Sequence, residues 1–241
     1  MTEIKFIPEK WSWANVSLEK LIAERNVPIE WLSFFNRPEV QAEIKKISDT
    51  IKTETEQGLI IYPPPNLVFQ AFTVPLEKIR LVLLGQDCYH DGAAVGLCFS
   101  VGKTSKINPS LLNIYRELEN EGYSPDKNGD ISHWAKQGVF MYNTALTVRK
   151  SAPESHLELW KNFSNLVLTE ISENVKNVGW ILLGSKACAF RPNNQTAFIT
   201  SHPSPFSAHK GFRQYPAFLG SDLFKKIDAF LVEHNQPPMK W

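Results

Sequence analysis

The chain has 241 residues, of which 43% are hydrophobic, and its formal net charge at pH 7 is +1. A chain of this length and apolar content can bury one sizeable core, so we expect a single domain over residues 1–241. The near-zero net charge excludes overall electrostatic attraction as a basis for binding nucleic acid or a membrane surface, so any DNA contact must come from local clusters of basic side chains.

Three cysteines, Cys88, Cys98 and Cys188, lack the spacing typical of a zinc site, and no leader with a charged and then an apolar region precedes them. The cysteines therefore favour a reducing, intracellular environment. The apolar runs are far shorter than the roughly 20 residues that span a bilayer, so no membrane segment is expected.

The N-terminal segment 1–57 is expected to be helical, and its clearest pattern lies at its end. Val40, Ile44 and Ile47 recur at helical spacing within residues 38–57 and predict an amphipathic helix there, with Gly58 suited to ending it. Three prolines at residues 63–65 then favour an extended stretch, and a short helix is expected at residues 66–72.

Short apolar runs that alternate with helical patterns predict an α/β fold. The run at residues 79–84 ends at Gly85 and is typical of a strand buried on both faces of a parallel sheet. The other predicted elements are strands at residues 139–142, 180–183 and 197–200, and helices at residues 110–121, 155–175 and 221–233. Ser155 and Glu158 fit a capping box at the start of the second of these helices.

Ligands of open parallel sheets bind beyond the carboxyl ends of the strands, so the polar residues that follow each predicted strand are candidates for a site. The first strand is followed by a turn that contains Asp87, Tyr89 and His90. The Asp87 carboxylate could orient a water molecule or stabilise a developing cation, or it could simply cap the next helical turn. A metal site with His90 and Asp91 is a further option, but nothing nearby completes it.

The next two strands end at residues with less specific chemistry. Asn143 follows the strand at residues 139–142, and its amide could read the edge of a nucleobase, although asparagine is also a common turn residue. Gly184 and Ser185 follow the strand at residues 180–183, where their backbone N–H groups could meet a phosphate or merely form a strand-to-helix turn.

The loop at residues 201–213 follows the last predicted strand and combines hydroxyls, two imidazoles and two cations around Phe206. Such a loop can hold phosphates while an apolar side chain enters a base stack as a wedge. The alternative is a proline-rich surface loop with Phe206 packed into the core.

Four motifs stand in order along the chain, at residues 85–90, 96–101, 134–139 with Asn143, and 202–205. Together they resemble family-1 uracil-DNA glycosylase, and further matches extend the resemblance over residues 58–211. It implies a three-layer α/β sandwich with a central four-stranded parallel sheet flanked by helices. It also implies hydrolysis of the N-glycosidic bond of flipped-out deoxyuridine in DNA, which releases uracil and leaves an abasic site.

The resemblance assigns roles to the candidate residues. Asp87 matches the carboxylate that positions water and stabilises the sugar cation, and His202 matches the histidine that hydrogen-bonds uracil O2. Asn143 matches the amide that reads the uracil edge and rejects cytosine. The other pocket positions are Gln86, which contributes through its backbone, Tyr89, which excludes the thymine methyl group, and Phe99, which stacks on uracil.

The residues that the resemblance assigns to DNA binding are Ser110, Gly184, Ser185, Ser204, Phe206, His209 and Lys210. The three serines match hydroxyls that compress the DNA backbone, and the last two residues lie where the family grips phosphate, so binding should weaken as salt rises. The resemblance implies no metal and no cofactor. The expected substrate is uracil in single- or double-stranded DNA, and the expected state is a monomer. The candidate protein partners are a DNA-mimicking inhibitor and a replication factor. The expected location is wherever DNA resides: the cytoplasm of a prokaryote, a nucleus or a virus factory.

The chain departs from the family pattern near residues 214–219, where the spacing is longer than usual, and at three further places. Cys88 stands where the family has proline, the loop at residues 91–95 is shorter by about one residue, and Phe206 replaces the usual leucine wedge. Two competing functions remain: a non-catalytic DNA-binding subunit, and a glycosylase of the same superfamily that acts on other bases. A nucleotide-cofactor enzyme is disfavoured because the chain contains neither a G-x-G-x-x-G motif nor a P-loop.

Overall fold

A four-stranded parallel sheet forms the centre of the computed structural model, which describes residues 12–24, 27–103 and 106–241. The strand order is β3-β2-β5-β6, with β2 at Leu81–Gly85, β3 at Val139–Asn143, β5 at Gly179–Leu183 and β6 at Thr196–Thr200. The predicted α/β class and all four predicted strands are confirmed. The first eleven residues of the expected N-terminal helical segment lie outside the described part of the chain.

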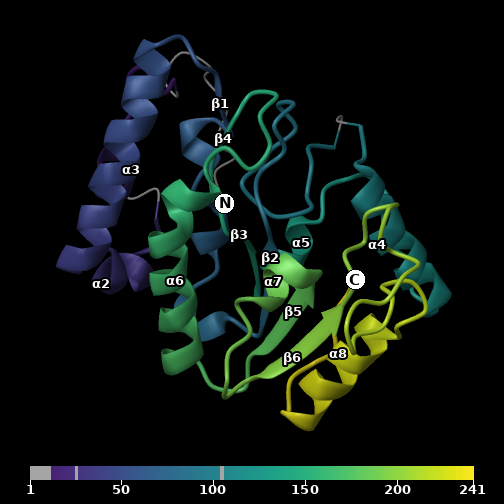
Figure 1. Ribbon diagram of the computed structural model, residues 1–241. Helices are drawn as coiled ribbons and strands as arrows, with labels where there is room; N and C mark the ends of the chain where they lie inside the picture. The colour runs from purple at the N-terminus through teal and green to yellow at the C-terminus, as the bar shows by residue number, and fades with distance from the viewer. Residues whose placement is uncertain (1–11, 25–26, 104–105) are drawn as a thin grey trace.

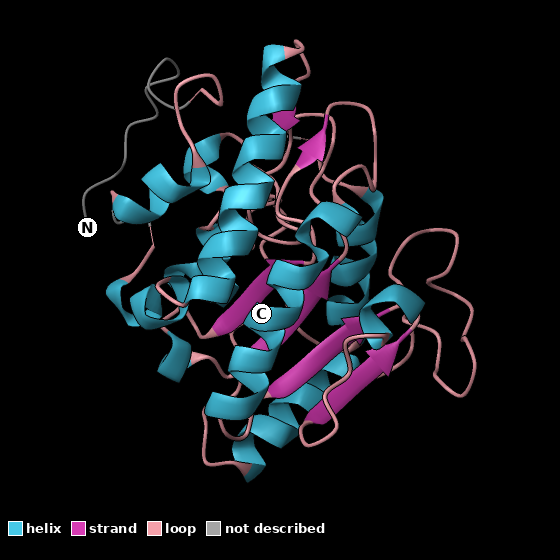
Figure 2. Cartoon of the chain, turned by 60° about the vertical axis from the view of Figure 1, so that its left-hand side comes forward, coloured by secondary structure: helices cyan, strands magenta, loops and turns pink. Residues whose placement is uncertain are grey.

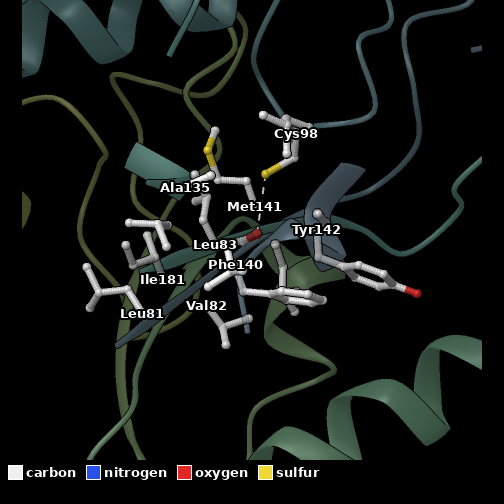
Figure 3. Packing of buried hydrophobic residues seen from close by; sticks show 14 of the residues in the cluster. Leu81, Val82, Leu83, Cys98, Ala135, Phe140, Met141, Tyr142 and Ile181 are labelled. Carbon is white, nitrogen blue, oxygen red and sulfur yellow. Dashed lines mark hydrogen bonds between the residues drawn. The ribbon is translucent and has the colours of Figure 1, made fainter. Parts of the chain in front are cut away.

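Continuous apolar sequence explains why three of these strands are fully buried. Every residue of β2, β3 and β5 is buried, as expected for strands covered on both faces. In register, Leu81 pairs with Val139 on one side and with Gly179 on the other. Figure 3 shows how Leu83, Phe140 and Met141 pack within this layer. The edge strand β6 is buried only at its last two residues, which brings its carboxyl end into the interior.

Helices cover both faces of the sheet (Figures 1 and 2). The chain passes from β2 to β3 through α4 (Pro109–Asn120) and α5 (Ser132–Ala135), and from β3 to β5 through α6 (Leu157–Asn174). These connections run in opposite directions along the strand order, so right-handed crossovers place α4 and α6 on opposite faces. Helix α3 (Pro38–Glu56) packs on α6, and α8 (Leu223–Glu233) lies on the side of α4.

The N-terminal helices share the core of the sheet. Trp31 ends a 3-10 turn at Ile29–Trp31 and packs 4.9 Å from Phe72 and 5.6 Å from Phe140 of β3, measured between ring centroids. The remaining N-terminal elements are α1 (Leu18–Ala23) and α2 (Leu32–Phe35). The predicted amphipathic helix is confirmed as α3, and Gly58 follows it with a φ of +83°, a left-handed conformation that glycine adopts without strain.

Two local predictions differ from the structure. The short helix expected at residues 66–72 is instead a pair of 3-10 turns, Pro65–Leu67 and Gln70–Thr73, because its hydrogen bonds join residues three apart. The capping box also does not form. The Ser155 hydroxyl accepts a hydrogen bond from the Arg149 backbone N–H at 2.9 Å, and α6 begins at Leu157 without a side-chain cap.

Several short helices and strands complete the fold. Strand β1 (Ile61–Tyr62) pairs antiparallel with β4 (Val148–Arg149), a 3-10 turn lies at Leu76–Lys78, and α7 (Ser185–Cys188) follows β5 directly. The connections that leave β2 and β5 turn to opposite faces of the sheet. A crevice between two such strands is the usual ligand site of an open α/β sheet.

Candidate active site

A cleft of about 630 Å³ lies beyond the carboxyl ends of β2, β3 and β6. It brings together nine of the predicted site residues: Gln86, Asp87, Tyr89, Phe99, Ser110, Asn143, His202, Ser204 and Phe206. Gly184 and Ser185 line a smaller adjoining cavity of about 200 Å³, which His202 also borders. The side chains of His209 and Lys210 are exposed and line neither space.

Asp87 is partly buried at the base of the cleft, in the turn that follows β2. Its Oδ2 accepts a hydrogen bond from the backbone N–H of Glu154 at 2.7 Å. Burial raises the pKa of the Asp87 carboxyl above its ordinary value, against the opposing effect of this hydrogen bond. The alternative in which Asp87 caps the next helical turn is wrong, because its partner lies 67 residues away in another loop.

Asn143 ends β3 directly beside the end of β2, where it pairs in register with Gly85. A Cβ atom at position 85 would lie 2.1 Å from Asn143 Oδ1, so the absence of a side chain at Gly85 makes room for this amide. The Asn143 side chain is buried, and its Nδ2 lies 3.6 Å from Cys88 Sγ as a donor. Its position at the cleft therefore depends on β2 and on the turn that follows it.

His202 follows β6, and its protonation state is set by its surroundings. Burial lowers the pKa of its imidazole, so the ring is neutral at pH 7. The Ser204 backbone N–H donates to His202 Nδ1 at 3.1 Å, which leaves the single ring proton on Nε2. His202 thus offers a neutral N–H donor, and Gly184 lets the start of α7 lie close to it, since a Cβ there would be 3.0 Å from His202 Cβ.

Two aromatic side chains shape the wall of the cleft. Phe99 has a φ of +62°, an uncommon conformation for a non-glycine residue, and its ring centroid lies 5.9 Å from that of His202. The Tyr89 hydroxyl donates to the Phe99 carbonyl oxygen at 3.3 Å. Such strain at a cleft is typical of residues that bind a ligand.

Phe206 projects from the loop after β6 and is 93% exposed. The alternative in which it packs into the core is therefore wrong. The loop that carries it is braced from within: the Ser201 hydroxyl donates to the Ser207 carbonyl oxygen at 2.9 Å, and the Ser204 and Ser207 hydroxyls lie 2.7 Å apart. A rigid loop that presents a bare aromatic ring to solvent fits insertion into a base stack.

The model of the uracil DNA glycosylase superfamily matches residues 72–227. The chain belongs to this superfamily. It is 37% identical over 222 residues to the uracil-DNA glycosylase of Psychromonas ingrahamii, a match that covers 88% of this chain and 100% of that protein. It is 43% identical over 198 residues to the uracil-DNA glycosylase of Borrelia duttonii, covering 79% and 85% of the two chains.

A solved structure supports the same assignment. The uracil-DNA glycosylase of mimivirus superposes on the chain with a TM-score of 0.86 at 27% sequence identity, covering 100% of this chain and 95% of that one. The predicted family and the predicted sheet with flanking helices are therefore confirmed.

Cys88, which stands where the family has proline, packs into the interior. Cys88 Sγ lies 3.3 Å from the Leu146 carbonyl oxygen, and burial raises the pKa of its thiol to about 12. The thiol is therefore protonated and buried, as is usual for a cysteine that packs in the interior. Cys88, Cys98 and Cys188 are all unpaired, and Cys98 donates to the Leu83 carbonyl oxygen at 3.3 Å (Figure 3).

The described residues contain neither a candidate metal site nor a candidate membrane-spanning helix. Residues 12–24, 27–103 and 106–241 contain no group of three or more His, Cys, Asp or Glu side chains that could hold a metal ion, so the Asp87–His90–Asp91 option is not realised. Within the same part of the chain, no helix has the length and the apolar content needed to cross a membrane.

Glu154 is a residue of the cleft that the sequence did not point to. It lines the cleft and contacts Asp87, yet it follows no strand and sits in the loop between β4 and α6. The only signal was its place within residues 58–211, over which the chain resembles the family.

Proposed function

We propose that the chain is a monofunctional uracil-DNA glycosylase that acts in base excision repair. Its membership of the superfamily and its uracil-DNA glycosylase relatives support excision of uracil from DNA. The main support for the mechanism is that Asp87, Asn143 and His202 line the same cleft. The Asp87 carboxylate can stabilise the sugar cation, and the Asn143 amide can hydrogen-bond the edge of the base. The neutral N–H of His202 can donate to the departing base.

The reaction breaks the bond between C1′ of the deoxyribose and N1 of uracil, and the bonding electrons leave with the base. Positive charge then develops on the sugar, where the Asp87 carboxylate stabilises it and orients the water that adds to C1′. Negative charge develops on uracil, and the Nε2–H of His202 donates to its O2. The water supplies hydroxyl to the sugar and a proton to the departing base, so no protein nucleophile is required.

Base selection follows from the wall of the cleft. Asn143 can donate to uracil O4 and accept from its N3–H, whereas cytosine would place its amine against the amide donor. Phe99 stacks on the base, and Tyr89 stands where a thymine methyl group would enter. Gln86 contributes through its backbone, whose carbonyl oxygen accepts from the Ala145 N–H at 2.9 Å and so fixes the turn beside β3.

DNA is proposed to lie across the rim of the cleft. Ser110 and Ser204 border the cleft, Gly184 and Ser185 border the adjoining cavity, and the last contacts come from the exposed His209 and Lys210. Hydroxyls and backbone N–H groups bind phosphate without reading sequence, which suits an enzyme that must find uracil in any context. Both single- and double-stranded DNA are proposed substrates.

The Phe206→Ala variant is expected to lose activity on duplex DNA. Removal of an aromatic side chain that stacks on bases costs ~1–3 kcal/mol, which corresponds to roughly 5- to 150-fold in affinity. The measurement is the enzyme concentration that gives half-maximal single-turnover uracil release from a duplex.

Single-stranded DNA is the control for this variant, because its uracil has no base pair to break and leaves no hole in a duplex for a wedge to fill. Its cleavage by Phe206→Ala should stay within a few-fold of the parent protein. Equal losses on both substrates, or no loss on the duplex, would contradict a wedge.

The proposal extends to organisation and partners. One domain over residues 1–241 is supported by a core that includes both Trp31 of the N-terminal segment and Phe140 of the sheet, and the proposed state is a monomer. We also propose that a protein can occupy the DNA-binding face, since mimivirus UNG Y322L is known in complex with the inhibitor protein UGI. The proposed reaction requires no metal and no cofactor, and the proposed location is wherever the DNA of the cell or virus lies.

Release of the free base tests the function. Incubation with an oligonucleotide that contains one uracil should release uracil, identified by mass spectrometry, and leave an abasic site. Matched oligonucleotides with thymine or cytosine at that position should release nothing. Release of another damaged base but not of uracil would favour a different substrate within the superfamily.

A further inference from the structure

One buried carboxylate fixes both ends of the loop between β4 and α6. Glu54 of α3 is 5% exposed; it forms an ion pair with Arg149, before the loop, and a hydrogen bond of 2.8 Å with His156 Nε2, after it. The His156 Nδ1 lies 2.7 Å from the Thr147 hydroxyl. The loop at residues 150–155 is therefore held against α3 and cannot shift without breaking the contacts of the buried Glu54 carboxylate.

This loop meets the turn that carries Asp87 at two points. The Ser151 N–H donates to the His90 carbonyl oxygen at 3.0 Å, and the Glu154 N–H donates to Asp87 Oδ2 at 2.7 Å. Glu154 has a φ of +66°, a left-handed conformation that is unfavourable for a residue with a Cβ. The strained backbone is what aims this N–H at the carboxylate, and strain at a cleft points to a functional constraint.

The side chain of Glu154 makes a second connection. Its Oε1 forms an ion pair with Lys186 Nζ, and the residues lie on different elements, the loop and α7. The pair with Lys186, followed by a hydrogen bond with Gln86, lowers the pKa of Glu154, so this carboxylate is ionised. Glu154 borders the main cleft and Lys186 borders the adjoining cavity, so the pair joins the two spaces.

We propose that Glu154 is a positioning residue that holds Asp87 through its backbone N–H, and that Lys186 balances the negative charge that the Glu154 side chain brings beside the reacting sugar. A glutamate at the edge of a DNA site would otherwise oppose both the phosphate and the ionisation of Asp87. The inference rests on the proposed function, in which Asp87 must be ionised.

The charges around Asp87 make the inference testable through the pH dependence of the rate. The charged and titratable groups that act on it are Glu154, His90 and Lys186. Burial is the main influence and raises the pKa of Asp87; the negative charge of Glu154 raises it further, while His90 and Lys186 lower it. Since activity needs the carboxylate, the rate is lost as pH falls through this pKa, and the acid limb of the pH profile reports it.

Two variants that break the same ion pair should therefore move the acid limb in opposite directions. Glu154→Gln removes the negative charge and should shift the limb to lower pH, whereas Lys186→Gln leaves that charge unbalanced and should shift it to higher pH. Each shift should be about 0.5 pH unit, less than the roughly 1–3 units of a buried contacting charge, because both side chains are half-exposed to solvent. The double variant should return towards the parent profile.

The experiment is single-turnover uracil release at saturating DNA across the acid pH range, with a ¹³C NMR titration of the Asp87 carboxyl in the DNA-free protein. A third variant, Glu154→Gly, keeps the N–H and suits the left-handed backbone, so it should reproduce the shift of Glu154→Gln. Shifts in one direction, or slower rates with an unmoved limb, would show a merely structural contact and overturn the inference.

The NMR titration separates the two proposals. Opposite shifts of the Asp87 titration in a protein that releases no uracil would support the charge pair and refute the proposed function. Uracil release with identical Asp87 titrations in all variants would retain the function and refute the charge pair.

Discussion

Replacing Asp87 with asparagine is expected to slow single-turnover uracil release by roughly 10²–10⁴-fold. The asparagine side chain keeps the shape and can still accept from the Glu154 N–H, but it has no charge to place beside the sugar cation. Removing one member of a buried charge interaction costs about 3–5 kcal/mol, and each ~1.4 kcal/mol in the barrier is tenfold in rate. The measurement is the rate at saturating enzyme on a uracil oligonucleotide.

The pH profile of this variant carries a second expectation. Burial raises the pKa of Asp87, so the parent protein should lose activity as pH falls through that raised pKa, and this dependence should vanish from the residual activity of Asp87→Asn. The matched control is Asp91→Asn in the same turn, an exposed carboxylate that accepts from the Ala93 N–H and should leave the rate unchanged. Similar rates for Asp87→Asn and the parent would remove Asp87 from the chemistry.

Replacing His202 with leucine is expected to reduce the rate by roughly 10²–10³-fold, as when a preorganised donor to a developing oxyanion is removed. Leucine fills a similar volume but cannot donate to uracil O2 as charge collects there. The Ser204 N–H would also lose its acceptor, so the fold of the loop must be checked from its thermal unfolding.

His234→Leu is the matched control for this substitution. His234 lies near the amino ends of β5 and β6, away from the cleft, and its Nδ1 is 2.8 Å from the Phe230 carbonyl oxygen. Its loss should leave single-turnover uracil release unchanged. A rate for His202→Leu close to that of this control would show that the departing base needs no donor from His202.

The strands and the outline of the site were predictable for one shared reason. A parallel sheet buried on both faces requires continuous apolar runs, and these mark β2, β3 and β5 without reference to any other part of the chain. Once the strands are located, the residues that follow them fall at one edge of the sheet. Asp87, Asn143 and His202 are found in this way although they are far apart in the sequence.

What escaped prediction depends on contacts between distant segments. Ser155 has the sequence of a helix cap, but its hydroxyl accepts instead from Arg149 in a loop whose ends Glu54 holds. The role of Glu154 rests on a left-handed backbone that no local pattern signals in a glutamate. Composition alone also left Phe206 undecided, since exposure of a phenyl ring depends on how the loop around it is braced.

Strand cleavage of an end-labelled oligonucleotide with one uracil, after alkaline treatment and with EDTA present, tests the central claim most directly. We predict breaks at the uracil, none at thymine or cytosine, no loss of activity in EDTA, and a sharp fall in Asp87→Asn. DNA binding without breaks would contradict the account and identify a non-catalytic DNA-binding protein on the same fold.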